Sequence, residues 1–235
     1  MTKKIKVEKK GILKKPDEFV SSSQKISNFF LENQKKILGI LITLCVLILF
    51  LFGWRFYSQK TDREAYLIYN QAVQYYNSDD ASGTSIKEET ERYNQAITSL
   101  EEVINGYSHT NVFPLALLYS GHIYYKLKKL DESIESYLRF IEKESSYNSL
   151  KVFAFAGLGY AYEAKGDYRN ALVYFIKLTE RDKNPFAQLG YLDLSRCYDS
   201  LGEKNKAIEA CQTLLTNYPN SVFAALAKKK MSILR

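Results

Sequence analysis

The chain has 235 residues, carries a formal net charge of +7 and is 46% hydrophobic, which is enough to build a folded core. The charge is concentrated at one end, because residues 1–36 hold ten lysines against four acidic residues and so carry +6 of the +7. A nucleic-acid-binding domain needs its basic residues on the folded part, so this distribution excludes that class and predicts no nucleic-acid partner. We expect residues 1–36 to be a basic tail that lies near anionic lipid.

Within this tail, residues 1–15 are rich in lysine and contain too few apolar residues to fold alone. Asp17 can cap a short amphipathic helix whose apolar side chains gather loosely on one side. These side chains are Phe19, Ile26, Phe29 and Phe30. Two interpretations of this segment stay open: a helix that lies on the lipid surface, and a cytoplasmic docking motif.

An uncharged apolar run, ILGILITLCVLILFLFGW, occupies residues 37–54, with Lys35 and Lys36 before it and Arg55 after it. A helix of this length rises about 27 Å, close to the thickness of the hydrocarbon core of a bilayer. A core helix of a soluble domain usually keeps a polar stripe, whereas this run is apolar all round. A cleaved signal peptide has a shorter apolar region followed by a small-x-small cleavage site, which is missing here. The sequence therefore predicts an uncleaved transmembrane anchor over residues 37–57.

The distribution of charge predicts the orientation of this anchor. Lysine-rich segments beside a transmembrane helix stay on the cytoplasmic side of the membrane. We therefore expect residues 1–36 in the cytoplasm and residues 58–235 outside it. Because residues 54–82 contain neither Gly nor Pro and keep helical spacing of apolar residues, the anchor helix is predicted to continue outward as a stiff stem.

A polar, turn-rich stretch follows at residues 77–87, and a further helix is predicted from about Glu88 to Asn105, ending at Gly106. From there the chain repeats every 36 to 38 residues. Each unit is two helices, and the first carries a small residue and then an aromatic one: Gly121 and Tyr124; Gly159 and Tyr162; Ser195 and Tyr198. The second helix carries a small residue and then a larger one: Ser133 and Tyr137; Ala171 and Phe175; Ala207 and Cys211. Two helices approach closely at the small residues, and such units stack because none buries its faces alone.

This pattern resembles the tetratricopeptide repeat. Its signature is matched best at Phe155, Leu158, Gly159, Tyr162, Ala171 and Phe175. The resemblance implies about four units, of which the first, around Ala72 and Ala96, is degenerate and has a protruding loop. The last segment, residues 221–235, is predicted to be a capping helix that places Phe223, Leu226, Ala227, Met231 and Leu234 on one side. The predicted fold is all-α: a single N-terminal transmembrane helix, a superhelix of tetratricopeptide-type helical hairpins over residues 58–235, and the C-terminal capping helix.

The whole arrangement, a Lys-rich tail with an Asp17-Glu18-Phe19 element, one anchor and an external repeat array, resembles the family of ancillary SecYEG translocon subunits (YfgM-like). The resemblance covers nearly the full chain by architecture. It implies a single-pass protein of the bacterial inner membrane whose periplasmic domain links the Sec translocon to periplasmic chaperones or emerging chains. The alternative is a fixed scaffold of another envelope machine, such as a flagellar motor collar or a division or secretion complex.

Residues that carry chemistry are sparse. His109 and His122 lie in separate units with no Cys or carboxylate at ligand spacing, so we expect no metal site. The sequence has no phosphate-binding glycine loop and no nucleophile elbow. The acidic pairs are interpreted as solvated helix faces: Glu88-Glu89, Glu101-Glu102 and Asp131-Glu132. We therefore expect a protein that is not an enzyme and has neither a cofactor nor a small-molecule substrate.

The three cysteines leave one alternative open. Cys45 lies inside the predicted anchor, whereas Cys197 and Cys211 fall in the two helices of one unit. A disulfide between the latter two is conceivable outside the cytoplasm. The other interpretation is two buried thiols that serve as small apolar residues.

A protein-binding role remains, and the resemblance implies that the first helix of each unit lines a concave face. The candidate positions on this face are Tyr66, Tyr69, Tyr76, Leu118, His122, Tyr125, Phe153, Tyr160, Glu163, Arg196 and Asp199. The set is rich in tyrosine, which offers a large contact area at low entropic cost and a polar tip for backbone groups. For each ring, packing between repeats is the alternative to partner binding.

Overall fold

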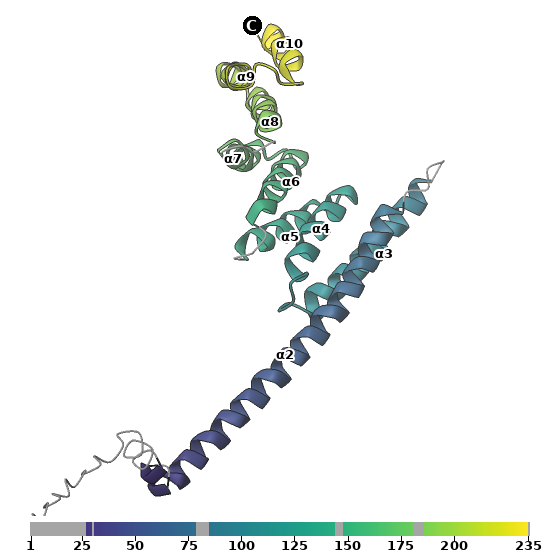
Figure 1. Ribbon diagram of the computed structural model, residues 1–235. Helices are drawn as coiled ribbons and strands as arrows, with labels where there is room; N and C mark the ends of the chain where they lie inside the picture. Colours follow the sequence, from purple (N-terminus) through teal and green to yellow (C-terminus); the bar gives the residue numbers. More distant parts are fainter. Residues whose placement is uncertain (1–26, 30, 79–84, 144–147, 181–185, 235) are drawn as a thin grey trace, which may run out of the picture. The chain divides into compact units, whose positions relative to one another are not determined.

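The computed structural model describes residues 27–29, 31–78, 85–143, 148–180 and 186–234. These residues are predominantly helical and include no strand, which confirms the predicted all-α class (Figure 1). The chain divides into two compact units, Met1–Tyr57 and Ser58–Arg235. The segment predicted to be capped by Asp17 and the loop predicted to protrude before the second helix fall largely outside the described residues.

Helix α2 is one uninterrupted helix from Gln34 to Asn77, as the lack of Gly and Pro after Trp54 predicted. It is long and apolar enough to cross a membrane, and its most apolar stretch is fully unburied within the structure. The last part of α2 belongs to the repeat unit, where Ala65 and Ala72 are buried against Ala96 and Leu100. This packing forms the first, degenerate hairpin.

The remaining helices follow α2 as successive hairpins: α3 (Ile86–Gly106), α4 (Phe113–Lys126), α5 (Leu130–Glu142), the 3-10 turn η1 (Asn148–Leu150), α6 (Lys151–Ala164), α7 (Tyr168–Thr179), α8 (Ala187–Ser200), α9 (Lys204–Asn217) and α10 (Ala224–Leu234). From α3 onward each helix packs on the next one in sequence, and α4 also contacts α6 directly. The described helices α3 to α10 therefore stack in sequence order, as repeated hairpins must in order to bury their apolar faces.

The small residues lie at close helix crossings, as predicted. A methyl group added at Gly159 of α6 would stand 2.3 Å from the nearest carbon of Phe175 on α7, and Phe175 is completely buried. The hairpin before it places Gly121 against Tyr137 in the same way. In the last hairpin a smaller pair takes this place, with the Cys211 thiol 3.2 Å from the Ser195 hydroxyl.

In all three of these hairpins, a residue with positive φ lies in the turn between the two helices. Gly166 and Gly202, with φ of +77° and +75°, follow α6 and α8, and Lys128 with φ of 62° follows α4. Glycine adopts this left-handed conformation without steric cost, which explains its presence at two of the three turns. Lys128 occupies the third turn with a conformation that side chains rarely adopt.

The structure distinguishes the two interpretations of Cys197 and Cys211. Cys197 and Cys211 are unbridged and fully buried, as the interpretation of two small apolar residues requires.

Ala227 and Leu234 of α10 are buried as predicted, but Leu226 is 55% exposed, so its placement on the packed side was wrong. The face of α10 that packs on α9 is narrow, and Leu226 lies outside that face.

Candidate functional site

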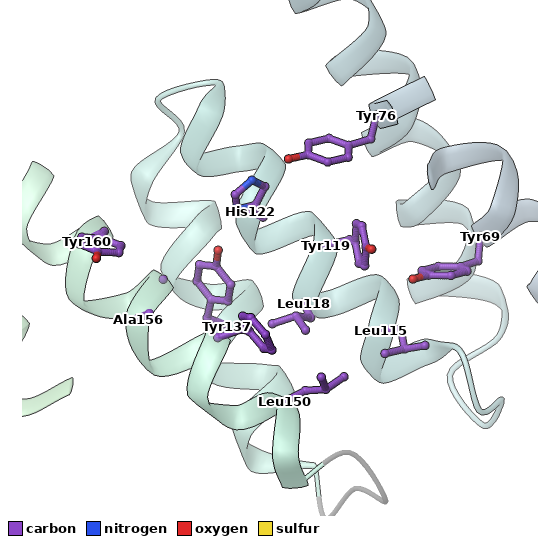
Figure 2. Close-up of a pocket in the computed structure, with 12 residues that line it drawn as sticks. Tyr69, Tyr76, Leu115, Leu118, Tyr119, His122, Tyr137, Leu150, Ala156 and Tyr160 are labelled. Carbon is purple, nitrogen blue, oxygen red and sulfur yellow. The ribbon is translucent and has the colours of Figure 1, made fainter. Parts of the chain in front are cut away.

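A groove of about 610 Å³ opens on the first helices of the early hairpins. Its walls come from the end of α2, from α4, and from the start of the third hairpin at η1 and α6 (Figure 2). The lining residues are Tyr69, Tyr76, Leu115, Leu118, Tyr119, His122, Tyr137, Leu150, Phe153, Ala156, Gly157 and Tyr160. None of them is Asp, Glu, Lys or Arg. The polar groups in the set are five tyrosine hydroxyls and one imidazole.

Six of the eleven predicted concave residues meet in this groove: Tyr69, Tyr76, Leu118, His122, Phe153 and Tyr160. They come from three successive first helices, α2, α4 and α6. The structure places Tyr66 elsewhere on α2, where its side chain is 53% exposed, and it places Tyr125 partly buried beside the second core, with the Lys128 ammonium 5.6 Å from its ring centre. These two residues do not line the groove.

The wall formed by α2 and α4 is held by packed aromatic rings. Tyr119 meets Tyr69 edge to face at 5.7 Å between ring centres and meets Tyr76 at 6.2 Å. The imidazole of His122 lies 5.6 Å from the Tyr76 ring. Edge-to-face pairs of this kind contribute about 0.5–1.5 kcal/mol beyond burial. Tyr69 is only 8% exposed, so it serves both the packing and the groove wall.

His122 adds no charge to the groove near neutral pH. Burial lowers the pKa of its imidazole below the ordinary value of 6.5, and Lys126 one turn further along α4 lowers it again. The neutral ring can donate one hydrogen bond and accept one. Phe153, on the α6 wall, is 47% exposed and meets the Phe186 ring at 5.1 Å.

A polar cluster around the buried carboxylate of Asp193 adjoins the groove at Tyr160. The Tyr160 hydroxyl donates to Asp193 Oδ2 at 2.9 Å, and Arg196 Nη1 lies 2.8 Å from Asp193 Oδ1. Arg196 also binds Glu163 in a bidentate manner, with Nε at 2.5 Å and Nη2 at 2.7 Å from its two oxygens. This cluster joins α6 to α8 and unites three predicted concave residues with Asp193, which the sequence did not single out.

Burial is the main influence on the pKa of Asp193, whereas hydrogen bonding is the main influence on that of Arg196. Asp193 is 1% exposed, and burial raises the pKa of its carboxyl to about 6 in spite of the neighbouring Arg196 and Tyr160. The hydrogen bonds to Glu163, followed by the charge of Asp193, raise the pKa of Arg196. The remaining predicted concave residue, Asp199, pairs instead with Lys230 of α10 and fastens the capping helix.

Other polar contacts connect one hairpin to the next outside the groove. Lys165 pairs with Asp131, and the Tyr124 hydroxyl donates to Glu101. Exposed pairs of this kind contribute at most about 1 kcal/mol each. His109 lies exposed in the turn before α4. Within the described part of the chain, no group of three or more His, Cys, Asp or Glu residues could hold a metal ion.

Sequence reasoning missed half of the groove residues. Leu115 and Tyr119 lie one helical turn from Leu118 and His122, so extending the spacing by three or four residues along α4 identifies them. Tyr137 lies on α5, a second helix, and the repeat pattern marks it only as the larger residue of that helix. No periodic signal marks it as a groove residue, because it reaches the groove from behind α4 and α6.

Comparison with known proteins identifies the repeat. Residues 157–222 match a family model described as tetratricopeptide repeat, and residues 117–142 match a second model with the same description. The chain contains tetratricopeptide repeats. Among solved structures, one titled MamA AMB-1 is 20% identical, with a TM-score of 0.53 over 74% of this chain and 81% of that chain. At this identity the likeness shows the fold alone, and comparison with curated proteins finds no match.

Tetratricopeptide repeats stacked in this way point to a protein that binds other proteins as an adaptor. An uncharged, aromatic groove on the first helices is consistent with this role, since large rings with polar tips are enriched where proteins bind partners.

Proposed function

We propose that the protein is a membrane-anchored adaptor of the bacterial inner membrane that links the Sec translocon to periplasmic chaperones or emerging chains. Residues 1–36 lie in the cytoplasm, residues 37–57 cross the membrane, and the repeat domain of residues 58–235 faces the periplasm. The chain acts by binding and not by catalysis. The observation that carries the proposal is the aromatic groove on the first helices of the repeats.

Two features support the membrane part of this proposal. The apolar stretch of α2 is fully unburied, and an apolar helix surface of that length is stable only when lipid or another protein covers it. Lys35 and Lys36 precede it, within a tail of ten lysines, and the positive-inside rule then favours a repeat domain outside the cytoplasm. The link to the translocon rests on the resemblance of the whole architecture to ancillary translocon subunits.

In-cell crosslinking followed by purification from membranes tests this function. The full-length protein is expected to recover translocon channel subunits together with periplasmic chaperones, identified by mass spectrometry. Phe153→Asp, which places a charge in the apolar groove, is expected to reduce this recovery by about tenfold or more, because a buried unpaired charge is costly. Val173→Asp is the matched control, since Val173 is 45% exposed and lies on α7 outside the groove.

Two outcomes contradict the proposal. Recovery of a constant set of motor, division or secretion-apparatus proteins without channel subunits replaces the translocon role with a fixed scaffold role. Equal recovery by Phe153→Asp and Val173→Asp removes the groove as the binding surface.

A further inference from the structure

Tyr137 reaches the groove by an unusual route. It is on α5, yet its ring passes between α4 and α6, where each neighbouring helix has a glycine in place of a side chain. A methyl group at Gly121 would lie 2.8 Å from the edge of the ring, and one at Gly157 would lie 2.3 Å from Cζ and 2.6 Å from the hydroxyl oxygen. Gly121 matches the repeat pattern, whereas Gly157 is an additional glycine two residues before the expected one at Gly159. The two glycines together leave room for a tyrosine to extend through the wall.

The end of this ring is a polar group without a hydrogen-bond partner among the described residues. Tyr137 is 3% exposed and lines the groove, and Figure 2 shows its hydroxyl directed between His122 and Tyr160. Among the described residues no hydrogen bond involves that hydroxyl, and it is not one of the fully buried side-chain atoms that lack a partner, so it opens onto the groove. By contrast, Tyr160 beside it donates to Asp193. A phenol whose ring is buried and whose hydroxyl opens onto a groove is placed to hydrogen-bond a segment bound there.

The chemistry of the groove limits what can supply that partner. Its walls are aliphatic and aromatic, and its one histidine is held neutral by burial, so a charged segment would lose its hydration without gaining an ion pair. A helix already satisfies its own backbone groups and would present only side chains to the hydroxyl. An extended segment presents free N–H and C=O groups along its length.

We propose that the Tyr137 hydroxyl hydrogen-bonds the backbone of an extended, uncharged, apolar segment of a partner protein bound in the groove. This inference rests on the proposed adaptor function and adds the conformation and charge of the bound segment. The groove volume of about 610 Å³ is within the ordinary range of ligand sites. The neutral imidazole of His122 offers a second hydrogen-bonding group nearby.

Binding of a defined peptide to the full-length protein in lipid nanodiscs tests the proposal. The probe is a fluorescent, end-blocked peptide of Leu, Val and Ser, and the comparison peptide has the same composition but is held helical by a hydrocarbon staple. Tyr137→Phe keeps the ring between the two glycines and removes only the hydroxyl. It is expected to weaken binding of the flexible peptide by about 3- to 10-fold, the value of one hydrogen bond. Binding of the stapled peptide is expected to be weak and equal in both proteins.

The melting temperature separates this role from a structural one. Tyr137→Phe is expected to leave it nearly unchanged, because the hydroxyl makes no hydrogen bond within the described part of the chain and the ring stays in place. Tyr174→Phe, whose ring stacks on Tyr162 outside the groove, is the control and is expected to bind both peptides as the wild type does. Equal affinity of wild type and Tyr137→Phe for the flexible peptide overturns the inference, as does a wild type that binds only the stapled peptide or neither. Partner recovery that depends on Phe153 would still uphold the adaptor function in each of these cases.

Discussion

Replacing Gly159 with alanine is expected to lower the free energy of unfolding of the repeat domain by about 2–3 kcal/mol, because the new methyl group overlaps a buried ring. It would stand 2.3 Å from Phe175, which has no exposed surface and therefore no free direction in which to move. Thermal and denaturant unfolding of the variant measure the loss.

Two comparisons test the reason for this loss. Gly106→Ala adds the same methyl group at a helix end with nothing within 4 Å, and it is expected to be neutral or slightly stabilising. Phe175→Leu removes part of the obstructing ring, so combined with Gly159→Ala it should cost less than the sum of the two single changes. Additive losses would show that the two side chains do not meet and would contradict this hairpin geometry.

Replacing Arg196 with methionine is expected to destabilise the domain by about 2–3 kcal/mol at pH 8, because Asp193 is left buried and charged without its cation. The cost is placed below that of a fully buried pair because Arg196 is 44% exposed. Denaturant unfolding from pH 5 to pH 8 provides the measurement.

The effect is expected to depend on pH in one direction. The pKa of Asp193 is already raised to about 6 and rises further without Arg196, so its carboxyl becomes neutral as the pH falls to 5. A raised carboxyl pKa favours the folded state at low pH and is a growing cost as the pH rises through that pKa. The loss in Arg196→Met should therefore shrink at pH 5. The double change Asp193→Asn with Arg196→Met should lose this pH dependence, and a pH-independent loss in the single variant would contradict the account.

The fold was predictable because its signals are local and repeated. The small residues at Gly121, Gly159 and Ser195 recur at a fixed period, and each of the three hairpins that contain them brings one against the larger residue of its second helix. The uninterrupted α2 followed from the absence of helix-breaking residues. Leu226 was misplaced because a capping helix packs on one side only, and helical spacing alone does not fix how wide that buried face is.

The groove was predictable only in part. Residues of the first helices, such as His122 and Phe153, follow from the repeat register, since equivalent positions share a face. Tyr137 and Asp193 do not, because each acts across a hairpin boundary and depends on how closely neighbouring units approach. Gly157 was the available signal for Tyr137, as a second glycine two residues from the expected one indicates that another side chain passes close to the helix.

Site-specific photocrosslinking in living cells tests most directly whether the groove is the partner-binding surface. A benzophenone amino acid is introduced in place of Phe153 in one full-length protein and in place of Val173 in another, two positions of nearly equal exposure. Partner adducts are expected after irradiation from position 153, which lines the groove, and none from position 173, which does not. Adducts of equal yield from both positions, or from position 173 alone, would contradict it.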